Sequence, residues 1–334
     1  MAPLDSLGRP LKALRISVTD RCNFRCTYCM PSEVFGPDYA FLPREAILSF
    51  EEITRLVRIF VGLGVTKVRL TGGEPLLRRE LPNLVQMLAA VPGIEDLALT
   101  TNGVLLSGLA PALFTAGLKR LTVSLDTLRP ERLRALSDTD LPLATILEGL
   151  EVARAAGFGP LKLNCVLQRG VNDDEILDLA AFARECGHTL RFIEFMDVGT
   201  TNGWQLDSVV RTTEVHRILH AQWPLELITA DERGVARRWR YVDGGGEVGL
   251  IASVTAPFCA DCDRARLSAD GHLFTCLFAG EGLDLKAFLR AGHRDADLAA
   301  LLASHWTRRA DRYSELRSAD TIGLPRVEMS RIGG

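Results

Sequence analysis

The stretch ALRISVTDRCNFRCTYC, residues 13–29, joins a strand-like run to three closely spaced cysteines. Residues 13–18 are predicted to form the first strand, and Cys22, Cys26 and Cys29 lie in the loop that follows it. Thiolates are soft ligands that suit an iron–sulfur cluster, and a cluster of four irons has four metal positions to bind. Three cysteines therefore leave one iron open for a small molecule. A zinc site is the alternative, although structural zinc takes four protein ligands and no histidine lies close by in the sequence.

Beyond this loop the chain alternates strand-like runs with amphipathic helical runs, the pattern of parallel βα units. Ser49 and Glu52 form a predicted capping box at the start of a helix, and Gly62 and Gly64 end it. Further strands are predicted at residues 67–70, 96–100, 120–125, 162–167 and 190–195, and further helices at residues 79–90, 145–156 and 174–186. Six strands in this order predict an open, partial barrel.

The pattern changes after about residue 200, where a helix near residues 212–220 is followed by alternating runs at 235–242 and 247–254. Gly244-Gly245-Gly246 joins these runs, which predicts a hairpin in a smaller second domain. The predicted fold class is therefore α/β. A partial (βα)6 TIM-type barrel in residues 1–200 is expected to be closed by a smaller C-terminal α+β domain in residues 201–334.

Composition limits the partners that the chain is expected to have. Its 334 residues carry a formal net charge of −3 and are 47% hydrophobic, which suits a globular protein with a large core. No apolar run is long enough to span a membrane and no signal peptide is recognisable, so we expect a cytoplasmic protein. The near-neutral charge argues against a nucleic-acid or membrane partner, and any anionic ligand should be small.

A second set of three cysteines, again without an obvious fourth, comprises Cys259, Cys262 and Cys276. A zinc ribbon is a stronger alternative for this set, because Cys-x2-Cys pairs are common in zinc sites and His272 lies between the ligands. Arg264 and Arg266 stand at alternate positions, so they project from one side of an extended segment. Guanidinium groups bind phosphate oxygens through paired hydrogen bonds, which indicates an anionic ligand near this set.

The motif Thr71-Gly72-Gly73-Glu74-Pro75 stands at the end of the predicted strand at residues 67–70. Its glycines let backbone amides approach a ligand closely, and Glu74 offers an acceptor for an ammonium group. Glycine and proline also mark plain turns, but the position after the cysteine loop favours a binding loop. Ser124 and Met196 lie at the ends of later strands, where barrel folds place their sites.

Three other features receive no catalytic role. Cys165 and Cys186 lie within apolar stretches and are expected to be small buried residues. Residues 244–249 fit the pattern G-x-G-x-x-G, but they join two strand-like runs and open no helix, so a hairpin turn is predicted. His216 and His220 stand four residues apart on a helix without a third ligand, and we expect them to be surface histidines.

The C-x3-C-x2-C spacing, with Tyr28 before the last cysteine, resembles the signature loop of the radical S-adenosylmethionine superfamily. The resemblance narrows to the GTP 3′,8-cyclase family and runs from about residue 5 to the last residue. It is carried by residues 14–22, 69–76 and 191–196, by the second cysteine set and by the terminal Gly333-Gly334.

This resemblance implies two [4Fe–4S] clusters and S-adenosylmethionine as cofactors. The methionine group would chelate the open iron of the first cluster, and one electron would cleave the sulfonium to give a 5′-deoxyadenosyl radical. That radical would take hydrogen from C3′ of GTP, and the C3′ radical would add to guanine C8. The product, (8S)-3′,8-cyclo-7,8-dihydroguanosine 5′-triphosphate, opens molybdenum cofactor biosynthesis, and the enzyme would be a lyase. The second cluster would bind guanine, and the Gly-Gly tail would reach toward the active site.

The resemblance also implies a role for each matching residue. The catalytic set would be Cys22, Cys26, Cys29, Arg264 and Arg266. S-adenosylmethionine would be contacted by Tyr28, Gly73, Glu74, Ser124 and Met196. GTP would be contacted by Arg15, Arg69, Thr100, Lys162, Arg264, Ala265 and Arg266. Iron would be held by Cys22, Cys26, Cys29, Cys259, Cys262 and Cys276. A triphosphate carries several negative charges, so cations from separate strands would suit it if the barrel brings them together.

The implied partners are GTP, a flavodoxin-type or ferredoxin-type electron donor, and cyclic pyranopterin monophosphate synthase as the next enzyme. A homodimer is one candidate for the oligomeric state. Two other functions stay open: a radical enzyme that acts on a peptide, and a non-catalytic iron–sulfur carrier or zinc-binding module. Arg264 and Arg266 favour a nucleotide over a peptide, and the two three-cysteine sets disfavour a carrier.

Overall fold

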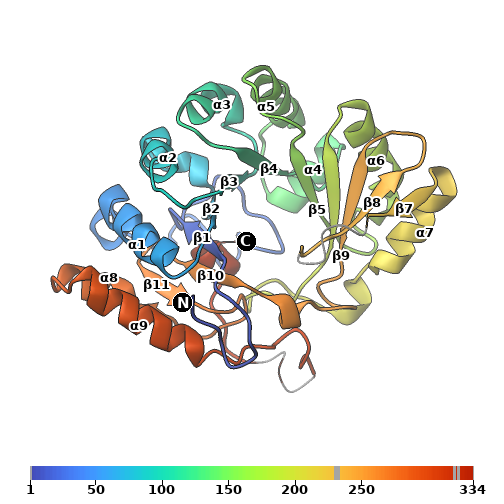
Figure 1. Ribbon diagram of the computed structural model, residues 1–334. Helices are drawn as coiled ribbons and strands as arrows, with labels where there is room; N and C mark the ends of the chain where they lie inside the picture. The colour runs from blue at the N-terminus through green and yellow to red at the C-terminus, as the bar shows by residue number, and fades with distance from the viewer. Residues whose placement is uncertain (1, 229–233, 319–320, 322–323, 334) are drawn as a thin grey trace.

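The structure is a computed structural model that describes residues 2–228, 234–318, 321 and 324–333. One continuous sheet curves into an arc, and helices cover its outer face (Figure 1). The six strands predicted for the barrel are present with boundaries shifted by at most one residue: β1 (Ala13–Ser17), β2 (Lys67–Thr71), β3 (Asp96–Thr101), β4 (Arg120–Ser124), β5 (Lys162–Leu167) and β6 (Thr189–Glu194). They pair in parallel and in sequence order, as the βα pattern predicts.

The barrel helices form where apolar residues repeat at helical spacing. Helix α1 begins after Ser49, whose side chain accepts from the Glu52 amide while the Glu52 carboxylate accepts from the Ser49 amide, so the predicted capping box is confirmed. Its apolar face is buried against the sheet. The helices of the barrel are α1 (Phe50–Gly62), α2 (Leu81–Ala89), α3 (Leu106–Thr115), α4 (Pro130–Ser137), α5 (Leu143–Ala155) and α6 (Ile176–Glu185), with short 3-10 turns η1 (Arg44–Ala46), η2 (Pro75–Leu77) and η3 (Asp173–Glu175).

The strands that follow residue 200 extend the same sheet at both edges. The strand order is β12-β11-β10-β1-β2-β3-β4-β5-β6-β9-β8-β7, with antiparallel pairs at the two ends. The added strands are β7 (Leu225–Leu227), β8 (Arg237–Tyr241), β9 (Glu247–Ile251), β10 (Arg264–Leu267), β11 (His272–Phe274) and β12 (Leu283–Asp284). Because β10 runs parallel to β1 with Arg264 opposite Ala13, Cys262 lies toward the amino end of β1, whereas the first cysteine loop follows its carboxyl end.

The predicted hairpin forms between β8 and β9, and it joins the sheet of the barrel. β9 pairs in parallel with β6, because Val248 and Leu250 continue the buried face that the barrel helices cover. The opposite edge is extended by β10, which pairs with β1. A domain boundary near residue 200 therefore remains a prediction, since strands on both sides of it share one sheet.

The last part of the chain crosses the open side of the arc and turns into it (Figure 1). Of the other elements in this part, α7 (Thr212–Gln222) packs beside α6 and α9 (Asp295–Thr307) beside α1, so both continue the outer layer of helices. The rest are η4 (Leu206–Ser208), η5 (Cys259–Asp261), α8 (Leu285–Arg290) and α11 (Met329–Ile332). Helix α11 lies against β1, so the C-terminus ends inside the arc.

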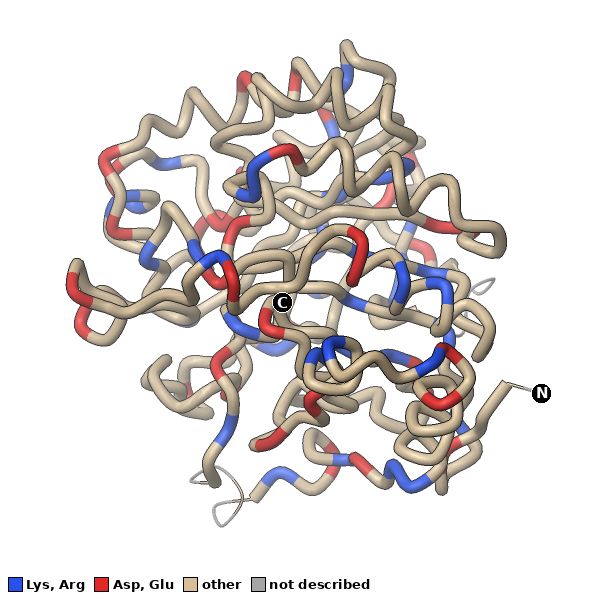
Figure 2. The backbone as a smooth tube through the Cα atoms, turned by 90° about the vertical axis from the view of Figure 1, so that its left-hand side faces the viewer, with Lys and Arg blue, Asp and Glu red and all other residues tan. Residues whose placement is uncertain are grey.

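The outer surface carries a mixture of charges. On the side drawn in Figure 2, basic and acidic residues are interspersed along the helices and loops. This distribution agrees with the near-neutral net charge of −3. Within the described ranges, no helix is both long enough and apolar enough to cross a membrane.

Candidate active site

A cavity of about 380 Å³ opens at the carboxyl ends of the parallel strands. Both predicted cysteine sets line it, although they are more than two hundred residues apart in the sequence. The lining cysteines are Cys22, Cys26, Cys29, Cys259, Cys262 and Cys276. The first set lies in the loop after β1, where barrel folds place their ligands, whereas Cys259 and Cys262 precede β10, so the cavity extends along the inner side of the strands.

The first cysteine loop is held by its own backbone and by one arginine. The amides of Cys29 and Met30 donate to the Cys26 carbonyl, which folds the loop into a tight turn. The Arg25 guanidinium donates to the Cys22 carbonyl at 2.8 Å and to the Phe35 carbonyl at 2.7 Å. The three thiol groups are thus fixed on the wall of the cavity.

The environment of these thiols suits a metal centre of positive charge. Burial raises the pKa of Cys22 to about 12, and the nearby Glu74 carboxylate adds to the effect. Burial and the other two cysteines raise the pKa of Cys26, and burial and Cys22 raise that of Cys29. Without a cation these thiols keep their protons, whereas iron would convert them into thiolate ligands. The donor set therefore fits a cluster. Among the described residues, no three His, Cys, Asp or Glu side chains lie close enough to hold a single metal ion.

The glycine motif after β2 supports the cysteine loop. A Cβ atom on Gly73 would lie 2.4 Å from the Arg21 carbonyl oxygen, and one on Gly72 would lie 2.7 Å from the Thr19 carbonyl oxygen. The Gly73 amide donates to that Thr19 oxygen at 2.9 Å. The Gly73 amide is thus occupied within the protein, but Gly73 lines the cavity, so its expected contact with S-adenosylmethionine stays a prediction. The two glycines are needed because the two loops pack backbone against backbone.

Glu74 is a buried carboxylate whose acceptors are partly occupied. It accepts from Thr101 Oγ1 at 2.7 Å and from the amides of Leu76 and Asn102 at 2.9 and 2.8 Å. Burial raises its pKa to about 7, although these three hydrogen bonds act in the opposite direction. A carboxylate has about four acceptor positions, so one remains for a ligand in the cavity that Glu74 lines.

The other predicted cofactor contacts also line the cavity: Tyr28, Ser124 and Met196. Tyr28 donates its hydroxyl proton to Asp126 Oδ2 at 2.6 Å, and Asp126 Oδ1 accepts from the Val166 amide. Burial raises the pKa of Asp126 to about 6. This pair joins the first cysteine loop to the ends of β4 and β5.

A row of arginines on adjacent strands forms the opposite wall. Arg15 on β1 stands in register with Arg266 on β10 and with Arg69 on β2. Arg191 on β6 also lines the cavity, and so does Arg264, two residues before Arg266. Because side chains alternate along strands, these guanidinium groups face the cavity while the intervening leucines and alanine face the helices.

These cations are buried together, and each disfavours the charge of the others. Burial and then Arg120 lower the pKa of Arg69 to about 10, while burial and then Arg69 lower that of Arg191 to about 9. Burial and Arg266 lower the pKa of Arg15. Arg69 donates only to hydroxyls, Thr100 Oγ1 at 3.0 Å and Thr122 Oγ1 at 3.1 Å. A polyanion in the cavity would relieve this repulsion.

The second cysteine loop faces the first across the cavity and lies beside cations. Arg264 and Arg309 lower the pKa of Cys262 to about 7, even though burial acts in the opposite direction. Burial raises the pKa of Cys276 to about 11. His272 lies on β11, where Nδ1 is 3.3 Å from the Asp270 carboxylate, and it does not line the cavity. The zinc-ribbon alternative therefore has no histidine ligand here.

The C-terminal tail enters the same cavity. Arg266 donates to the Gly333 carbonyl, and Met329 lines the cavity wall. Gly333 lies against Thr71 at the end of β2, so close that an added Cβ would overlap the Thr71 hydroxyl. The expected approach of the tail to the active site agrees with this position of Gly333, while Gly334 lies outside the described residues.

Two of the residues expected to contact GTP do not line the cavity. Ala265 points into the hydrophobic core, because it alternates with the two arginines that flank it. Lys162 lies at the start of β5 and is not among the lining residues. Burial lowers its pKa to about 8, and the nearby Arg120, Arg191 and Arg69 add to this effect. The expected contacts of Ala265 and Lys162 with GTP therefore stay predictions. Arg15, Arg69, Thr100, Arg264 and Arg266 do line the cavity.

The polar residues of the cavity that sequence reasoning missed include Asn164, Arg191 and Arg309. Arg191 Nε and Asn164 Oδ1 are buried without a hydrogen-bond partner, which marks them as groups that a ligand could satisfy. Arg191 lies in residues 191–196, which carry part of the family resemblance. It could have been recognised as a site residue because it is a lone charged residue at an inward-facing position of a buried strand. Arg309 belongs to no recognisable motif.

The features without a predicted catalytic role are partly as expected. Cys165 is buried, whereas Cys186 is only half-buried, because it stands at the end of α6 where the helix meets solvent. His220 is exposed and accepts from the Leu225 amide through Nδ1. His216 is half-buried, since its ring packs on Trp239, so the expectation of a surface histidine is wrong for this residue.

Comparison with known proteins places the chain in a family. Residues 16–183 match the model of the Radical SAM superfamily, and residues 188–315 match the model described as Molybdenum Cofactor Synthesis C. The chain is 56% identical to the GTP 3′,8-cyclase of Acidothermus cellulolyticus, over 96% of this chain and 90% of that protein. It is 54% identical to the GTP 3′,8-cyclase of Xanthomonas axonopodis pv. citri, over 100% of this chain and 99% of that protein. The chain belongs to the GTP 3′,8-cyclase family.

The fold of this family member is also similar to that of solved structures. Streptococcus suis SuiB bound to S-adenosylmethionine matches with a TM-score of 0.62 at 16% identity, over 93% of this chain and 68% of that one. Methylornithine synthase matches with a TM-score of 0.51 at 17% identity, over 92% of this chain and 85% of that one. At such identities the match concerns the fold, and it agrees with the predicted α/β partial barrel.

Proposed function

We propose that the chain is a GTP 3′,8-cyclase that converts GTP into 3′,8-cyclo-7,8-dihydroguanosine triphosphate. The observation that carries this proposal is the row of buried arginines between two sets of three cysteines. GTP would lose a hydrogen atom from ribose C3′, form a bond between C3′ and guanine C8, and gain a proton and an electron. We propose the lyase class for this cyclase.

The first half of the cavity would bind S-adenosylmethionine beside the N-terminal cluster. Cys22, Cys26 and Cys29 would hold three irons of this cluster. When bound, the cluster and S-adenosylmethionine together supply the one-electron chemistry that removes hydrogen from carbon. Glu74 would accept from the methionine ammonium through its remaining acceptor position. Tyr28, Ser124 and Met196 would then enclose the cofactor and exclude water.

The second half of the cavity would bind GTP. Arg15, Arg69 and Arg266 face one another from adjacent strands, so they would hold the phosphates at a fixed distance from the first cysteine loop. Arg191 would add a fourth cation from β6, the last of the six barrel strands. Because a radical reacts with whichever C–H bond it meets, this fixed position is the main contribution of the protein to selectivity.

Further parts of the proposal concern groups that the cavity would recruit. Cys259, Cys262 and Cys276 would hold a second [4Fe–4S] cluster, whose open iron would face the guanine ring. The Gly333 carbonyl, bound by Arg266, would limit the space available to GTP. A flavodoxin-type or ferredoxin-type donor would supply the electron, and cyclic pyranopterin monophosphate synthase would use the product. We propose a cytoplasmic protein, with a homodimer as one candidate assembly.

A peptide substrate is less well supported by these observations. Arg15 and Arg191 are buried and form no ion pair with any described residue, so a neutral backbone would leave them unsatisfied, whereas a triphosphate offers them several charged oxygens. A carrier or zinc module would have no need of an arginine row beside its cysteines.

The test is anaerobic incubation of the reduced protein with S-adenosylmethionine and GTP, followed by chromatography and mass spectrometry. We expect 5′-deoxyadenosine together with a product that has the mass of GTP but a different retention time. A variant with Arg264→Ala and Arg266→Ala should keep slow cleavage of S-adenosylmethionine and lose GTP binding. Failure of the unaltered protein to form 5′-deoxyadenosine, or recovery of all GTP unchanged, would refute the proposed function.

A further inference from the structure

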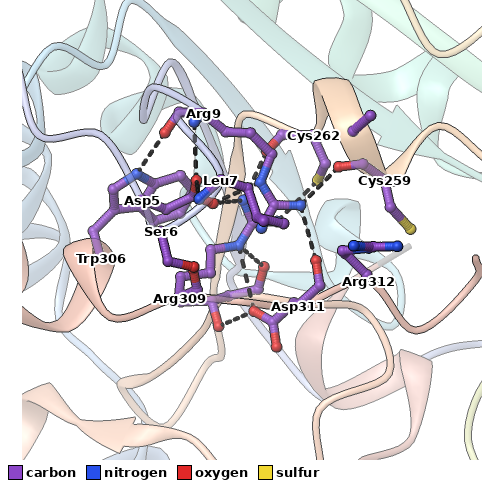
Figure 3. Close-up of polar contacts among 12 residues, drawn as sticks. Asp5, Ser6, Leu7, Arg9, Cys259, Cys262, Trp306, Arg309, Asp311 and Arg312 are labelled. Atoms are coloured by element: carbon purple, nitrogen blue, oxygen red, sulfur yellow. Dashed lines mark hydrogen bonds and ion pairs between the residues drawn. The ribbon is translucent and has the colours of Figure 1, made fainter. Parts of the chain in front are cut away.

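A buried ionic cluster lies against the second cysteine loop. It joins the N-terminal segment, the end of α9 and the loop that carries Cys259 and Cys262 (Figure 3). Its charged members are Asp5, Arg9 and Arg309, whose side chains are 0%, 3% and 1% exposed. Burying three charges is costly unless they are paired and hydrogen-bonded, so a cluster of this kind calls for an explanation.

Asp5 is the centre of the cluster. Its carboxylate accepts from Arg9 Nε at 2.6 Å and from Arg309 Nη1 at 3.0 Å, as well as from the amides of Leu7 and Arg9. Arg9 in turn donates through Nη1 to the Cys259 carbonyl at 2.7 Å. The N-terminal segment therefore fixes the backbone of the cysteine loop.

Arg309 makes the closest contact with a cysteine sulfur. Its Nη2 donates to Cys262 Sγ at 3.2 Å, its Nη1 donates to the Cys262 carbonyl at 2.7 Å, and its Nε donates to the Thr275 carbonyl at 3.1 Å. The guanidinium carbon lies 4.6 Å from the centre of the Trp306 ring. Trp306 donates from Nε1 to the Arg9 carbonyl, which ties α9 to the same segment. Arg309 is thus held on four sides and directed at one sulfur.

We infer that Arg309, held in place by Asp5, is a positioning residue for the second iron–sulfur cluster. Its guanidinium fixes Cys262 as a ligand and raises the reduction potential of that cluster. A cation and an N–H donor beside a coordinating sulfur stabilise the form of the cluster that carries more negative charge. The sulfurs of the first set accept from neutral groups such as the Phe24 amide at 3.4 Å. The two clusters therefore differ in potential, the second being more easily reduced.

This inference rests on the proposed second cluster. The experiment therefore begins with the full chain in which Cys22, Cys26 and Cys29 are replaced by Ser, so that any iron belongs to the second set. Arg309→Gln, Arg309→Lys and the control Arg308→Gln are introduced into this parent. Arg308 is the exposed neighbour of Arg309 and donates only to the Ser304 carbonyl among the hydrogen bonds of the described residues. Iron and sulfide per chain are measured, and the midpoint potential is followed by electron paramagnetic resonance.

We expect Arg308→Gln to match the parent in both measurements. Arg309→Gln should shift the midpoint to a more negative value, and Arg309→Lys should shift it less, since lysine keeps the charge but not the forked donors. Loss of iron from both Arg309 variants, with unchanged circular dichroism, would also support the positioning role. An unchanged midpoint and spectrum in Arg309→Gln would overturn the inference. Absence of iron from the parent would instead refute the second cluster itself.

Discussion

Arg191 offers a quantitative test of the buried cation row, because its charge is unfavourable for the empty protein and useful for binding. Burial, followed by Arg69 and Arg120, lowers its pKa from 12.5 to about 9. That difference corresponds to a cost of at most about 5 kcal/mol for holding the charge at neutral pH. The hydrogen bond from Arg191 Nη2 to Thr122 Oγ1, at 3.3 Å, and the packing of the side chain return about 1–2 kcal/mol.

Replacement of Arg191 by Met should therefore stabilise the protein without GTP by about 1–3 kcal/mol, because an uncompensated buried charge is removed. The same variant should bind GTP roughly 10- to 100-fold more weakly, since one charge-assisted hydrogen bond is worth about 1.5–3 kcal/mol. Binding of guanosine, which has no phosphates, should change much less.

The assay combines anaerobic urea denaturation without nucleotide and equilibrium binding of GTP and guanosine. Arg237→Met serves as the matched control, because Arg237 is an exposed residue of β8 that does not line the cavity. A variant at Arg191 that is destabilised by more than about 2 kcal/mol, or that binds GTP with unchanged affinity, would refute the reasoning.

Three further predictions follow from single positions. Lys162 has a pKa of about 8 and loses its charge as pH rises through 8, so the affinity for GTP should fall between pH 7 and 9. Lys162→Met should make this pH profile flatter, and an equally steep profile in the variant would contradict the prediction. Gly73→Ala should lose iron from the first cysteine set, because the added Cβ would lie 2.4 Å from the Arg21 carbonyl oxygen in the cysteine loop. The control Gly108→Ala should keep its iron, because the space around the added Cβ is open. Asp197→Asn should lower the free energy of unfolding by about 3–5 kcal/mol in urea denaturation, because the buried Asp197 carboxylate pairs with two arginines. The control Asp207→Asn, at an exposed position, should leave the stability nearly unchanged, and equal stabilities of the two variants would argue against the pairing.

The order of the barrel elements was predictable because each is specified locally. The capping box at Ser49, the alternation along strands and the glycines after helices all act within a few residues. The pairing of β9 with β6 was not predictable in this way. A hairpin pattern indicates two adjacent strands, but the edge that they join depends on contacts between distant parts of the chain.

The cysteine sets were equally predictable, since their spacing carries the chemistry. The glycine motif was located correctly, but its packing against the first cysteine loop was not foreseen, because a close approach to another backbone and a close approach to a ligand have the same sequence signal. Arg191 and Arg309 were missed because a single arginine on a strand or after a helix is usually solvated. The folded structure distinguishes them from solvated arginines, because several strands converge around Arg191 and the N-terminal segment contacts Arg309.

The most direct test of the central claim, that the cavity holds GTP with its ribose C3′ next to S-adenosylmethionine, is turnover of GTP that carries deuterium at C3′. The reaction would be run without oxygen, and the isotopic mass of the 5′-deoxyadenosine formed would be measured. The arrangement described here predicts that this 5′-deoxyadenosine contains one deuterium atom. Release of 5′-deoxyadenosine without deuterium, while GTP is being consumed, would contradict it.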